Sequence, residues 1–154
     1  MNYVAIDLGA ESVRTIVGSL DGDKLSIEEV HRFPNILIRN GSSIRWDISM
    51  ILHFVLSGLE SAVLHSPKSR FNLQSISADS WGVDYVFLDS NGCPQLPVYN
   101  YRDPRTNWSA PELLRKISWP EIFSETGIQY MPINTLFQLA AETPERISTQ
   151  GTLP

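Results

Sequence analysis

Several residue types that mark common protein classes are scarce in this sequence. There is 1 cysteine among 154 residues, which excludes an intramolecular disulfide, and no cysteine–histidine spacing typical of zinc sites is present. Lysine and arginine number 12 against 17 acidic residues, for a formal net charge of −5, and they form no basic run. Nonspecific binding to nucleic acids or acidic membranes depends on clustered cations, so neither partner is expected.

The sequence also shows neither a basic leader nor an apolar run that approaches the length of a membrane span. We therefore expect a cytoplasmic location. Cys93 follows the turn pair Asn91-Gly92, and no histidine lies near it in the sequence to activate it, so it is expected to be an incidental loop thiol. An apolar content of 42% and a charged content of 19% are ordinary for a folded globular protein.

An acid interrupts the first apolar segment of the chain. Val4–Leu8 predicts a buried strand, yet it contains Asp7 and is followed by Gly9, where the backbone must turn. Burying a carboxylate is unfavourable without a compensating charge, which favours a metal ion or an arginine beside Asp7. Gly9 permits a positive φ, so the amides up to Ser12 can form an anion-binding nest, to which Ser12 and Arg14 add a hydroxyl and a cation. The alternative is a β-hairpin in which Asp7 only caps the turn.

The next segments predict two more strands and a helix. Asp21-Gly22-Asp23 is a hairpin turn, so the strands on either side of it are expected to be antiparallel. A helix is expected to begin after Asp47, its N-cap, and to end at Ser66-Pro67. The strands are Val13–Val17 and Lys24–Phe33, and the apolar stripe of the helix is Ile48, Ile51, Leu52, Val55, Leu56, Leu59 and Val63.

A further short strand, Leu73–Asp79, follows this helix. A helix of crossover length favours parallel pairing, and the first strand is the simplest partner. Asp79–Asp84 would then lie at the same sheet edge as Asp7 and Gly9. Open α/β sheets bind ligands at that edge.

The rest of the chain predicts a second hairpin and two short helices. Tyr85–Leu88 and Leu96–Tyr99 are expected to pair as the arms of the hairpin. The helices are expected between Ser118 and Gly127, on a capping-box pattern, and from Asn134 to Pro144, after which no closing element is expected.

Separated segments of the chain resemble one protein family. Asp7–Arg14 resembles the first phosphate motif of the sugar-kinase, actin and heat-shock-chaperone superfamily. Asp79–Tyr85, Tyr101–Thr106 and Thr126–Tyr130, followed by Asn134–Leu139, resemble the FGGY carbohydrate kinases, and among these the kinases of L-rhamnulose.

The resemblance implies an α/β, ribonuclease-H-like domain whose mixed sheet starts with three antiparallel strands. Residues 1–154 would be the amino-terminal portion of the first kinase domain, incomplete at its carboxyl end and without the adenine-binding domain. The general-base aspartate of the relatives is expected beyond residue 154, so no catalytic residue is assigned. The chain by itself is expected to be inactive.

The implied reaction is transfer of the ATP γ-phosphoryl group to a hydroxyl of L-rhamnulose, with Mg²⁺ as the second cofactor. The resemblance assigns Asp7 to the magnesium ion, Asp7, Gly9, Ala10, Glu11, Ser12, Val13 and Arg14 to the nucleotide, and Trp81, Gly82, Asp84, Arg102, Asp103 and Gln129 to the sugar.

Other interpretations stay open at this point. Trp81 and Tyr85 are common core residues, and Asp103 can pair with Arg102 or Arg105 instead of a sugar. The family commonly has a small residue where this chain has Glu11 and a glycine where it has Val13, which favours a noncatalytic sugar- or nucleotide-binding module. A kinase for another ketose or polyol is a third interpretation. Exposed sheet or helix faces would also favour self-association.

Overall fold

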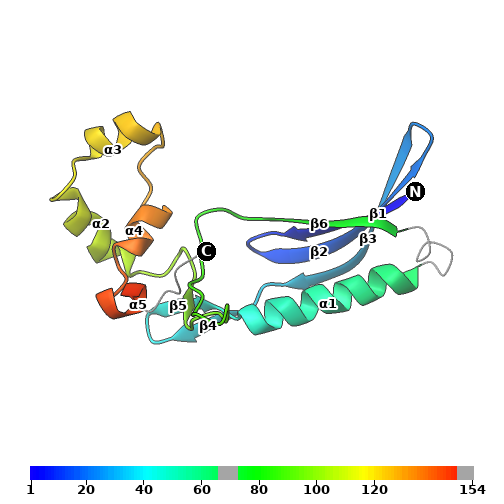
Figure 1. Ribbon diagram of the computed structural model, residues 1–154, viewed down its shortest axis with the longest axis horizontal. Coiled ribbons are helices and arrows are strands. Elements are labelled where there is room, and N and C mark those ends of the chain that lie inside the picture. The colour runs from blue at the N-terminus through cyan, green and yellow to red at the C-terminus, as the bar shows by residue number, and fades with distance from the viewer. Residues whose placement is uncertain (66–72, 149–154) are drawn as a thin grey trace. The chain divides into compact units, whose positions relative to one another are not determined.

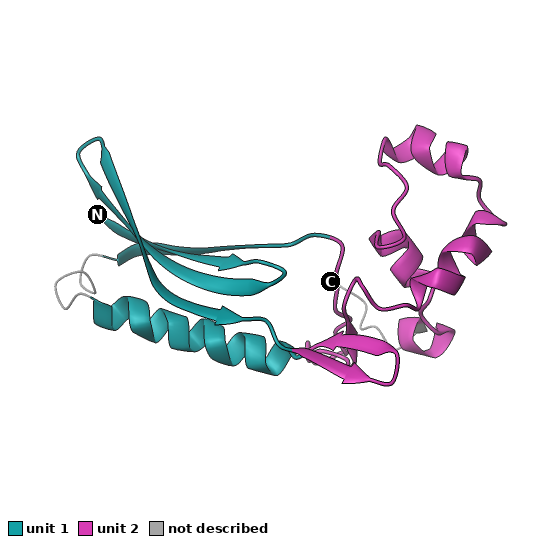
Figure 2. Cartoon of the chain, turned by 180° about the vertical axis from the view of Figure 1, so that it is seen from behind, with its two compact units in different colours: residues 1–36, 47–82 teal, residues 37–46, 83–154 magenta. Residues whose placement is uncertain are grey.

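The computed structural model describes residues 1–65 and 73–148. These residues form two compact units, shown in different colours in Figure 2. Unit 1 comprises Met1–Ile36 and Asp47–Gly82, and unit 2 comprises Leu37–Trp46 and the chain from Val83 onward. Each unit is described separately below.

Unit 1 is a sheet with one helix on one face (Figure 1). Its strands β1 (Asn2–Leu8), β2 (Ser12–Asp21), β3 (Lys24–Pro34) and β6 (Leu73–Ser80) lie in the order β3-β2-β1-β6. The first three are antiparallel and β6 is parallel to β1, as the sequence predicted. The helix α1 (Ile48–His65) packs against β2 and β3.

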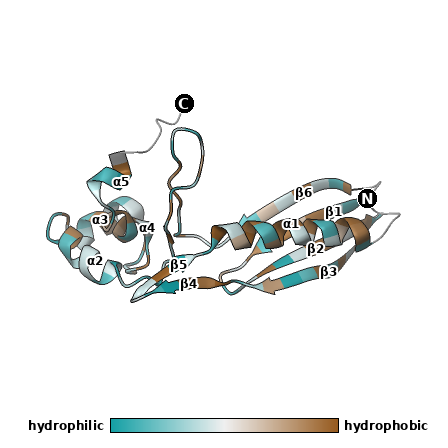
Figure 3. Cartoon of the chain, turned by 90° about the horizontal axis from the view of Figure 1, so that it is seen from below, coloured by the Kyte–Doolittle hydropathy of each residue, from teal (hydrophilic) through white to brown (hydrophobic). Residues whose placement is uncertain are grey.

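Alternation along the strands separates a core face from an open face. Val4 and Ile6 of β1 are 2% exposed and belong, with Val13 and Val17 of β2, to one hydrophobic cluster that contacts α1. The residues between them, including Asp7 of β1, point to the other side of the sheet. The change from hydrophilic to hydrophobic residues along the strands is visible in Figure 3.

The amino end of α1 is capped as predicted. The Oδ1 atom of Asp47 accepts a hydrogen bond from the amide of Met50 at 3.0 Å. With 18 residues and a mean hydropathy of 1.5, α1 is also long and apolar enough to be a candidate membrane span by length and composition alone, which corrects the expectation that no run approaches that length. Here the helix covers the sheet, and Gly58 and Ala62 are its buried residues.

The face of α1 that meets the sheet differs from the predicted apolar stripe. Phe54, Val55 and Leu59 pack against the core cluster around Gly58 and Ala62. Leu52 and Leu56 of the predicted stripe are 59% and 55% exposed, and Figure 3 shows hydrophobic residues on the outer side of the helix. At Gly58 the helix lies too close to Thr15 of β2 to leave room for a Cβ atom.

Unit 2 combines a small sheet with four short helices. Its antiparallel sheet has the order β4-β5-β7, and the β4–β5 hairpin turns at Gly41, whose φ is +59°. The elements are β4 (Leu37–Asn40), β5 (Ser43–Trp46), β7 (Val98–Tyr99), α2 (Thr106–Leu114), α3 (Trp119–Thr126), α4 (Thr135–Leu139) and α5 (Pro144–Ser148).

The predicted hairpin of Tyr85–Leu88 with Leu96–Tyr99 is wrong. Leu88 makes an isolated bridge with Pro94, whereas Val98 and Tyr99 pair with β5. The turn between the predicted arms is present, because Asp89 accepts hydrogen bonds from two backbone amides of that turn and Gly92 has a φ of +78°. The hydrogen-bonding edge of β7 pairs with β5, which is distant in sequence, and not with the Tyr85–Leu88 segment.

The short helices confirm most of the predicted boundaries. Ser118 accepts a hydrogen bond from the amide of Glu121 at the start of α3, and Gly127 ends it with a φ of +65°. Asn134 occupies the N-cap position of α4, although its side chain bonds elsewhere. The predicted end of the second helix at Pro144 is wrong, because α4 ends at Leu139. The helices α2 and α5 were not predicted, and Pro144 begins α5.

The close contact of α1 with β2 predicts a stability effect. A Cβ atom on Gly58 would lie 2.0 Å from the Oγ1 atom of Thr15, which is itself fully buried. We expect Gly58→Ala to lower the free energy of unfolding by about 1–3 kcal/mol, measured by urea denaturation. Gly18→Ala, whose Cβ would meet only Leu25 at 3.8 Å, is the matched control. Addition of Thr15→Ala should restore part of the loss; no restoration would contradict the steric explanation.

Exposed apolar residues on the edge strand β3 predict that the protein self-associates. Leu25 and Ile27 are 59% and 68% exposed, and β3 is an outer strand of its sheet. We expect light scattering to show a mean mass that rises with protein concentration, and Ile27→Lys to lower it. A constant monomer mass over a wide concentration range would refute this prediction.

Candidate functional site

The carboxyl ends of β1 and β6 lie together in unit 1. Asp7 pairs in register with Asp79, and Leu8 with Ser80. Beyond the last pair, the amide of Trp81 donates a hydrogen bond to the carbonyl of Leu8 at 3.3 Å. The turn after β1 and the segment from Asp79 to Trp81 therefore share one sheet edge, as the sequence predicted.

Asp7 has an arginine as its partner. Asp7 and Arg14 are opposite each other on β1 and β2, and Asp7 Oδ2 lies 2.5 Å from Arg14 Nη2. Their side chains are 31% and 37% exposed, so the pair is open to a ligand. The carboxylate is thus compensated by a cation that can also bind phosphate oxygens.

A second arginine lies beside the first on the neighbouring strand. Arg32 of β3 pairs in register with Arg14, contacts Ser12 Oγ at 3.5 Å, and forms an ion pair of 2.5 Å with Glu29. The hydrogen bond from Arg32 lowers the pKa of Glu29 below its usual value. Asp7, Arg14, Arg32 and Glu29 thus form a row in which two adjacent arginines lie between two acids, here called the charge row. Its two guanidinium groups next to a hydroxyl suit an anion.

The turn after β1 needs Gly9 for space rather than for a positive φ. Its amide donates to the carbonyl of Ser12 at 3.1 Å, and a Cβ atom on Gly9 would lie 2.9 Å from that oxygen. Gly9 is not among the glycines of positive φ. The close approach of the two strand ends therefore selects glycine, and the Gly9 amide is used within the turn.

Asn35 braces this turn from the end of β3. Its Nδ2 atom donates to the carbonyl of Gly9 at 2.6 Å, and its backbone amide donates to the carbonyl of Glu11 at 3.0 Å. Its Oδ1 atom is buried and has no hydrogen-bond partner within the part of the chain that the structure describes. No local sequence signal indicates this role, since Asn35 and Gly9 are far apart along the chain.

The other predicted nucleotide residues differ in what their side chains can reach. Val13 is 0% exposed in the core of unit 1, so its side chain does not line the turn and its β-branch strains no loop. Glu11 is exposed beside Ala10, which is half-buried.

No cluster of three or more histidine, cysteine, aspartate or glutamate side chains that could hold a metal ion occurs among residues 1–65 and 73–148. Asp7 and its register partner Asp79 supply two carboxylates at the sheet edge. Magnesium is commonly held by one or two carboxylates together with water and substrate phosphates. The residues present therefore fit an ion that arrives with a nucleotide.

Gly82 follows Trp81 at the end of unit 1. A Cβ atom on Gly82 would meet no atom within 4 Å, so packing within the chain does not demand glycine there. Trp81 is half-buried. The backbone at Gly82 is open to close approach by a ligand.

Asp84 is held by two donors within unit 2. Its Oδ2 atom accepts from Trp46 Nε1 at 2.6 Å, and its Oδ1 atom accepts from Gln138 Nε2 at 3.3 Å. These contacts orient the carboxylate of Asp84 within unit 2.

The residue before Asp84 has an unusual backbone. Val83 has a φ of +72°, a region that β-branched residues rarely occupy. Its carbonyl accepts hydrogen bonds from Thr135 Oγ1 at 2.7 Å and Gln138 Nε2 at 3.1 Å. Gln138 is 1% exposed and also donates to the carbonyl of Ile133. The helix α4 therefore fixes the conformation of the Val83–Asp84 segment.

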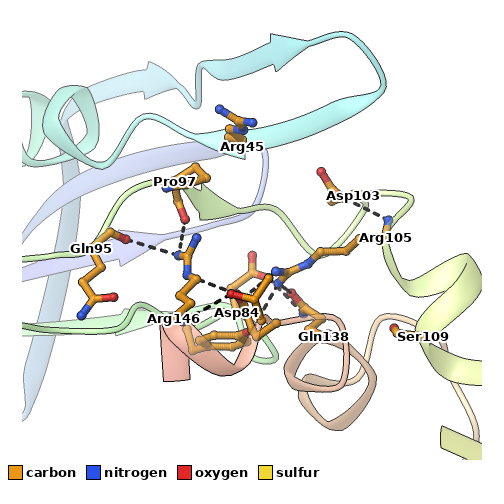
Figure 4. Close-up of polar contacts among 12 residues, drawn as sticks. Arg45, Asp84, Gln95, Pro97, Asp103, Arg105, Ser109, Gln138 and Arg146 are labelled. Atoms are coloured by element: carbon orange, nitrogen blue, oxygen red, sulfur yellow. Dashed lines mark hydrogen bonds and ion pairs between the residues drawn. The ribbon is translucent and has the colours of Figure 1, made fainter. Parts of the chain in front are cut away.

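A buried ion network supports Gln138 (Figure 4). Arg105 donates to Gln138 Oε1 at 3.2 Å and forms an ion pair of 2.5 Å with Glu142, which is also paired with Arg146. Tyr85 donates to the same carboxylate, and burial together with this hydrogen bond raises the pKa of Tyr85 far above its usual value. The side chain of Glu142 is 3% exposed, so the network is a structural element of unit 2.

The remaining predicted sugar residues lie in different surroundings. Asp103 is 5% exposed and accepts hydrogen bonds from Ser43 Oγ and from two backbone amides, which fastens its loop to β5. Arg102 is exposed, with its guanidinium 5.2 Å from the ring centre of Tyr101. Gln129 is exposed and its Nε2 atom contacts the sulfur of Met131 at 3.3 Å.

The brace at Asn35 predicts a measurable loosening of the turn. We expect Asn35→Ala to lower the free energy of unfolding by about 1 kcal/mol and to speed hydrogen exchange of the amides of residues 9–12. The matched control is Asn107→Ala, at an exposed position of α2. Equal exchange rates in the two variants would show that Asn35 does not hold the turn.

The chain is similar in sequence to proteins of known family. Residues 2–144 match the model of the FGGY family of carbohydrate kinases, N-terminal domain. The chain is 43% identical over 138 residues to a rhamnulokinase of Bacteroides thetaiotaomicron and 41% identical over 138 residues to one of Oceanobacillus iheyensis. Each alignment covers 90% of this chain and 28% of the relative, so the chain spans less than a third of the length of these curated relatives.

Solved structures show the same fold. The xylulose kinase of Rhodospirillum rubrum matches with a TM-score of 0.82 at 16% identity, over 99% of this chain and 31% of that one. This likeness supports the predicted fold class: an α/β arrangement, with a mixed sheet, of the kind found in sugar kinases.

Proposed function

The chain belongs to the FGGY family of carbohydrate kinases, and from this premise we propose that it forms the amino-terminal portion of the first domain of an ATP-dependent kinase that phosphorylates L-rhamnulose. The substrate is suggested by the rhamnulokinases at 41% and 43% identity. A cytoplasmic location accords with such a metabolic role. We assign no general base to the chain.

The observation that carries the proposal is the shared edge of β1 and β6. It brings Asp7, the charge-row residue on β1, and the turn after β1 close to Trp81, whose amide donates a hydrogen bond to the carbonyl of Leu8. Phosphoryl transfer depends on positioning and on compensating charge more than on covalent chemistry. Arg14 and Arg32 on β2 and β3 supply compensating charge. Gly82, which follows β6, leaves room for a substrate to be positioned.

The cationic side chains would bind the phosphates of the nucleotide, and the acidic side chain of Asp7 would bind the metal ion. Arg14 and Arg32, with the Ser12 hydroxyl, would bind phosphate oxygens, since all three groups gather on neighbouring strands. Asp7 would hold magnesium through water and would release Arg14 to the phosphates as it does so. Bound magnesium supplies charge neutralisation for the transferring phosphoryl group.

The sugar would be bound by side chains and backbone at the end of β6 and beyond. Gly82 would allow its backbone to contact the polyol, Trp81 would offer an apolar face, and Asp84 would accept hydroxyl hydrogens. Arg102, Asp103 and Gln129 are further proposed contacts. Of these, Asp103 has the most complete set of partners within the protein.

Calorimetric titration tests the proposal. L-rhamnulose, L-fuculose, xylulose and glycerol are titrated with and without Mg-ATP, and we expect L-rhamnulose to bind most tightly. A preference for another sugar would favour a kinase of that sugar. Sugar or nucleotide binding by a longer protein that phosphorylates nothing would favour a noncatalytic module.

Gly82→Ala tests the sugar contact apart from folding. Because a Cβ at this position meets no atom of the chain, we expect an unchanged melting temperature and an affinity for L-rhamnulose lowered by at least about tenfold, or ~1.4 kcal/mol. Gly18→Ala, in the same unit, is the control and should bind the sugar as the parent protein does. Unchanged affinity in Gly82→Ala would remove Gly82 from the site.

A further inference from the structure

Unit 2 contains an apolar pocket to which no role has been given. Its volume is about 300 Å³, at the lower end of the range for small-molecule sites. The walls come from the Val83 segment, from α3, and from the stretch that leads into α4. The apolar lining residues are Val83, Trp119, Ile122, Ile128, Leu136 and Phe137.

The deeper walls of this pocket are rigid. Phe137 and Ile122 are 1% and 9% exposed. The ring of Tyr130 makes edge contacts with Trp119 and Phe137, at centroid distances of 5.4 and 5.3 Å. Aromatic contacts of this kind hold side chains in fixed positions, so the pocket is formed before a ligand arrives.

One wall of the pocket is formed by a residue in an unfavourable backbone conformation. Val83 lines the pocket with a φ of +72°, and its carbonyl is held by Thr135 and Gln138. Strained backbone persists where surrounding structure overdetermines it, and it gathers at ligand sites. The hydrogen bonds of α4 thus keep an apolar side chain at this wall.

The pocket adjoins the proposed sugar contacts of unit 2. Asp84 directly follows the lining residue Val83, and Gln129 directly follows the lining residue Ile128. The side chain of Asn134, also in the lining, donates to the carbonyl of Gln129 at 3.2 Å. In each of the segments Val83–Asp84 and Ile128–Gln129, an apolar pocket residue is therefore followed by a polar residue that could bind a sugar hydroxyl.

A ketose fits such a surface only if one end of it is apolar. L-rhamnulose is a 6-deoxy sugar and ends in a methyl group, whereas xylulose and glycerol end in hydroxymethyl groups. A methyl group gains by leaving water. A hydroxyl would find few partners there, because the lining hydroxyls of Thr126 and Thr135 already donate to the carbonyls of Ile122 and Val83. We propose that the pocket binds the terminal methyl group of the 6-deoxyketose and so selects deoxy sugars. This inference rests on the proposed function and names a specificity site for it.

Saturation-transfer NMR of L-rhamnulose with the protein tests this proposal directly. The methyl doublet is resolved from the other sugar protons, and we expect it to receive the strongest saturation. Saturation of the other protons with a weak methyl signal would refute the pocket but not sugar binding. No saturation of any proton would refute the proposed function, and the pocket with it.

Two leucines of α4 provide a matched pair of variants. Leu136 lines the pocket and is 41% exposed, whereas Leu139 is not part of the lining and is 39% exposed. We expect Leu136→Asn to weaken L-rhamnulose binding about fourfold and to lower the relative methyl saturation, while Leu139→Asn changes neither. An equal effect of both variants would overturn the proposal.

Val83→Gly provides a second variant that does not threaten the fold. Glycine adopts a positive φ without strain, so the melting temperature should not fall, yet one apolar wall is removed. We expect relative methyl saturation to fall again. Unchanged methyl saturation in a folded Val83→Gly protein would exclude contact between the methyl group and this wall.

Discussion

The parallel pairing of β6 with β1 is the constraint on which the candidate site of unit 1 depends. The two strands are far apart in sequence, and only their register brings Asp7 beside Asp79 and Leu8 beside Trp81. A shift by one residue would send each side chain of β6 to the opposite face of the sheet. The carboxylate of Asp79 would then lie on the face of the sheet opposite to that of Asp7.

The packing of α1 fixes which faces of β1 and β2 are buried. Val4, Ile6, Val13 and Val17 are buried on the face that meets the helix, so each strand is fixed by its apolar alternation. The same alternation leaves Asp7 and Arg14 on the open face, where an ion pair remains accessible. In unit 1, one face of the sheet therefore forms the core and the other face carries the candidate ligand-binding side chains.

Unit 2 relies on buried polar groups instead. Gln138 links the strained carbonyl of Val83 to Asp84 and to Arg105, and Glu142 holds Arg105 and Arg146. Buried polar groups are costly when they lack partners, and Tyr85 and backbone carbonyls add hydrogen bonds to this network. Its effect is to hold the Val83–Asp84 segment in one conformation, beside the apolar pocket.

Local sequence determined the elements whose causes are local. Strand alternation, the Asp47 and Ser118 caps and the Gly127 stop could all be read from neighbouring residues, and so could the motif from Asp7 to Arg14 that carries the family resemblance. Tertiary structure alone decided the pairing of β7 with β5, the side of α1 that is buried, the brace at Asn35 and the position of Val83. These features depend on contacts between segments distant in sequence, and neither propensity nor periodicity records which distant group completes a hydrogen bond or fills a space.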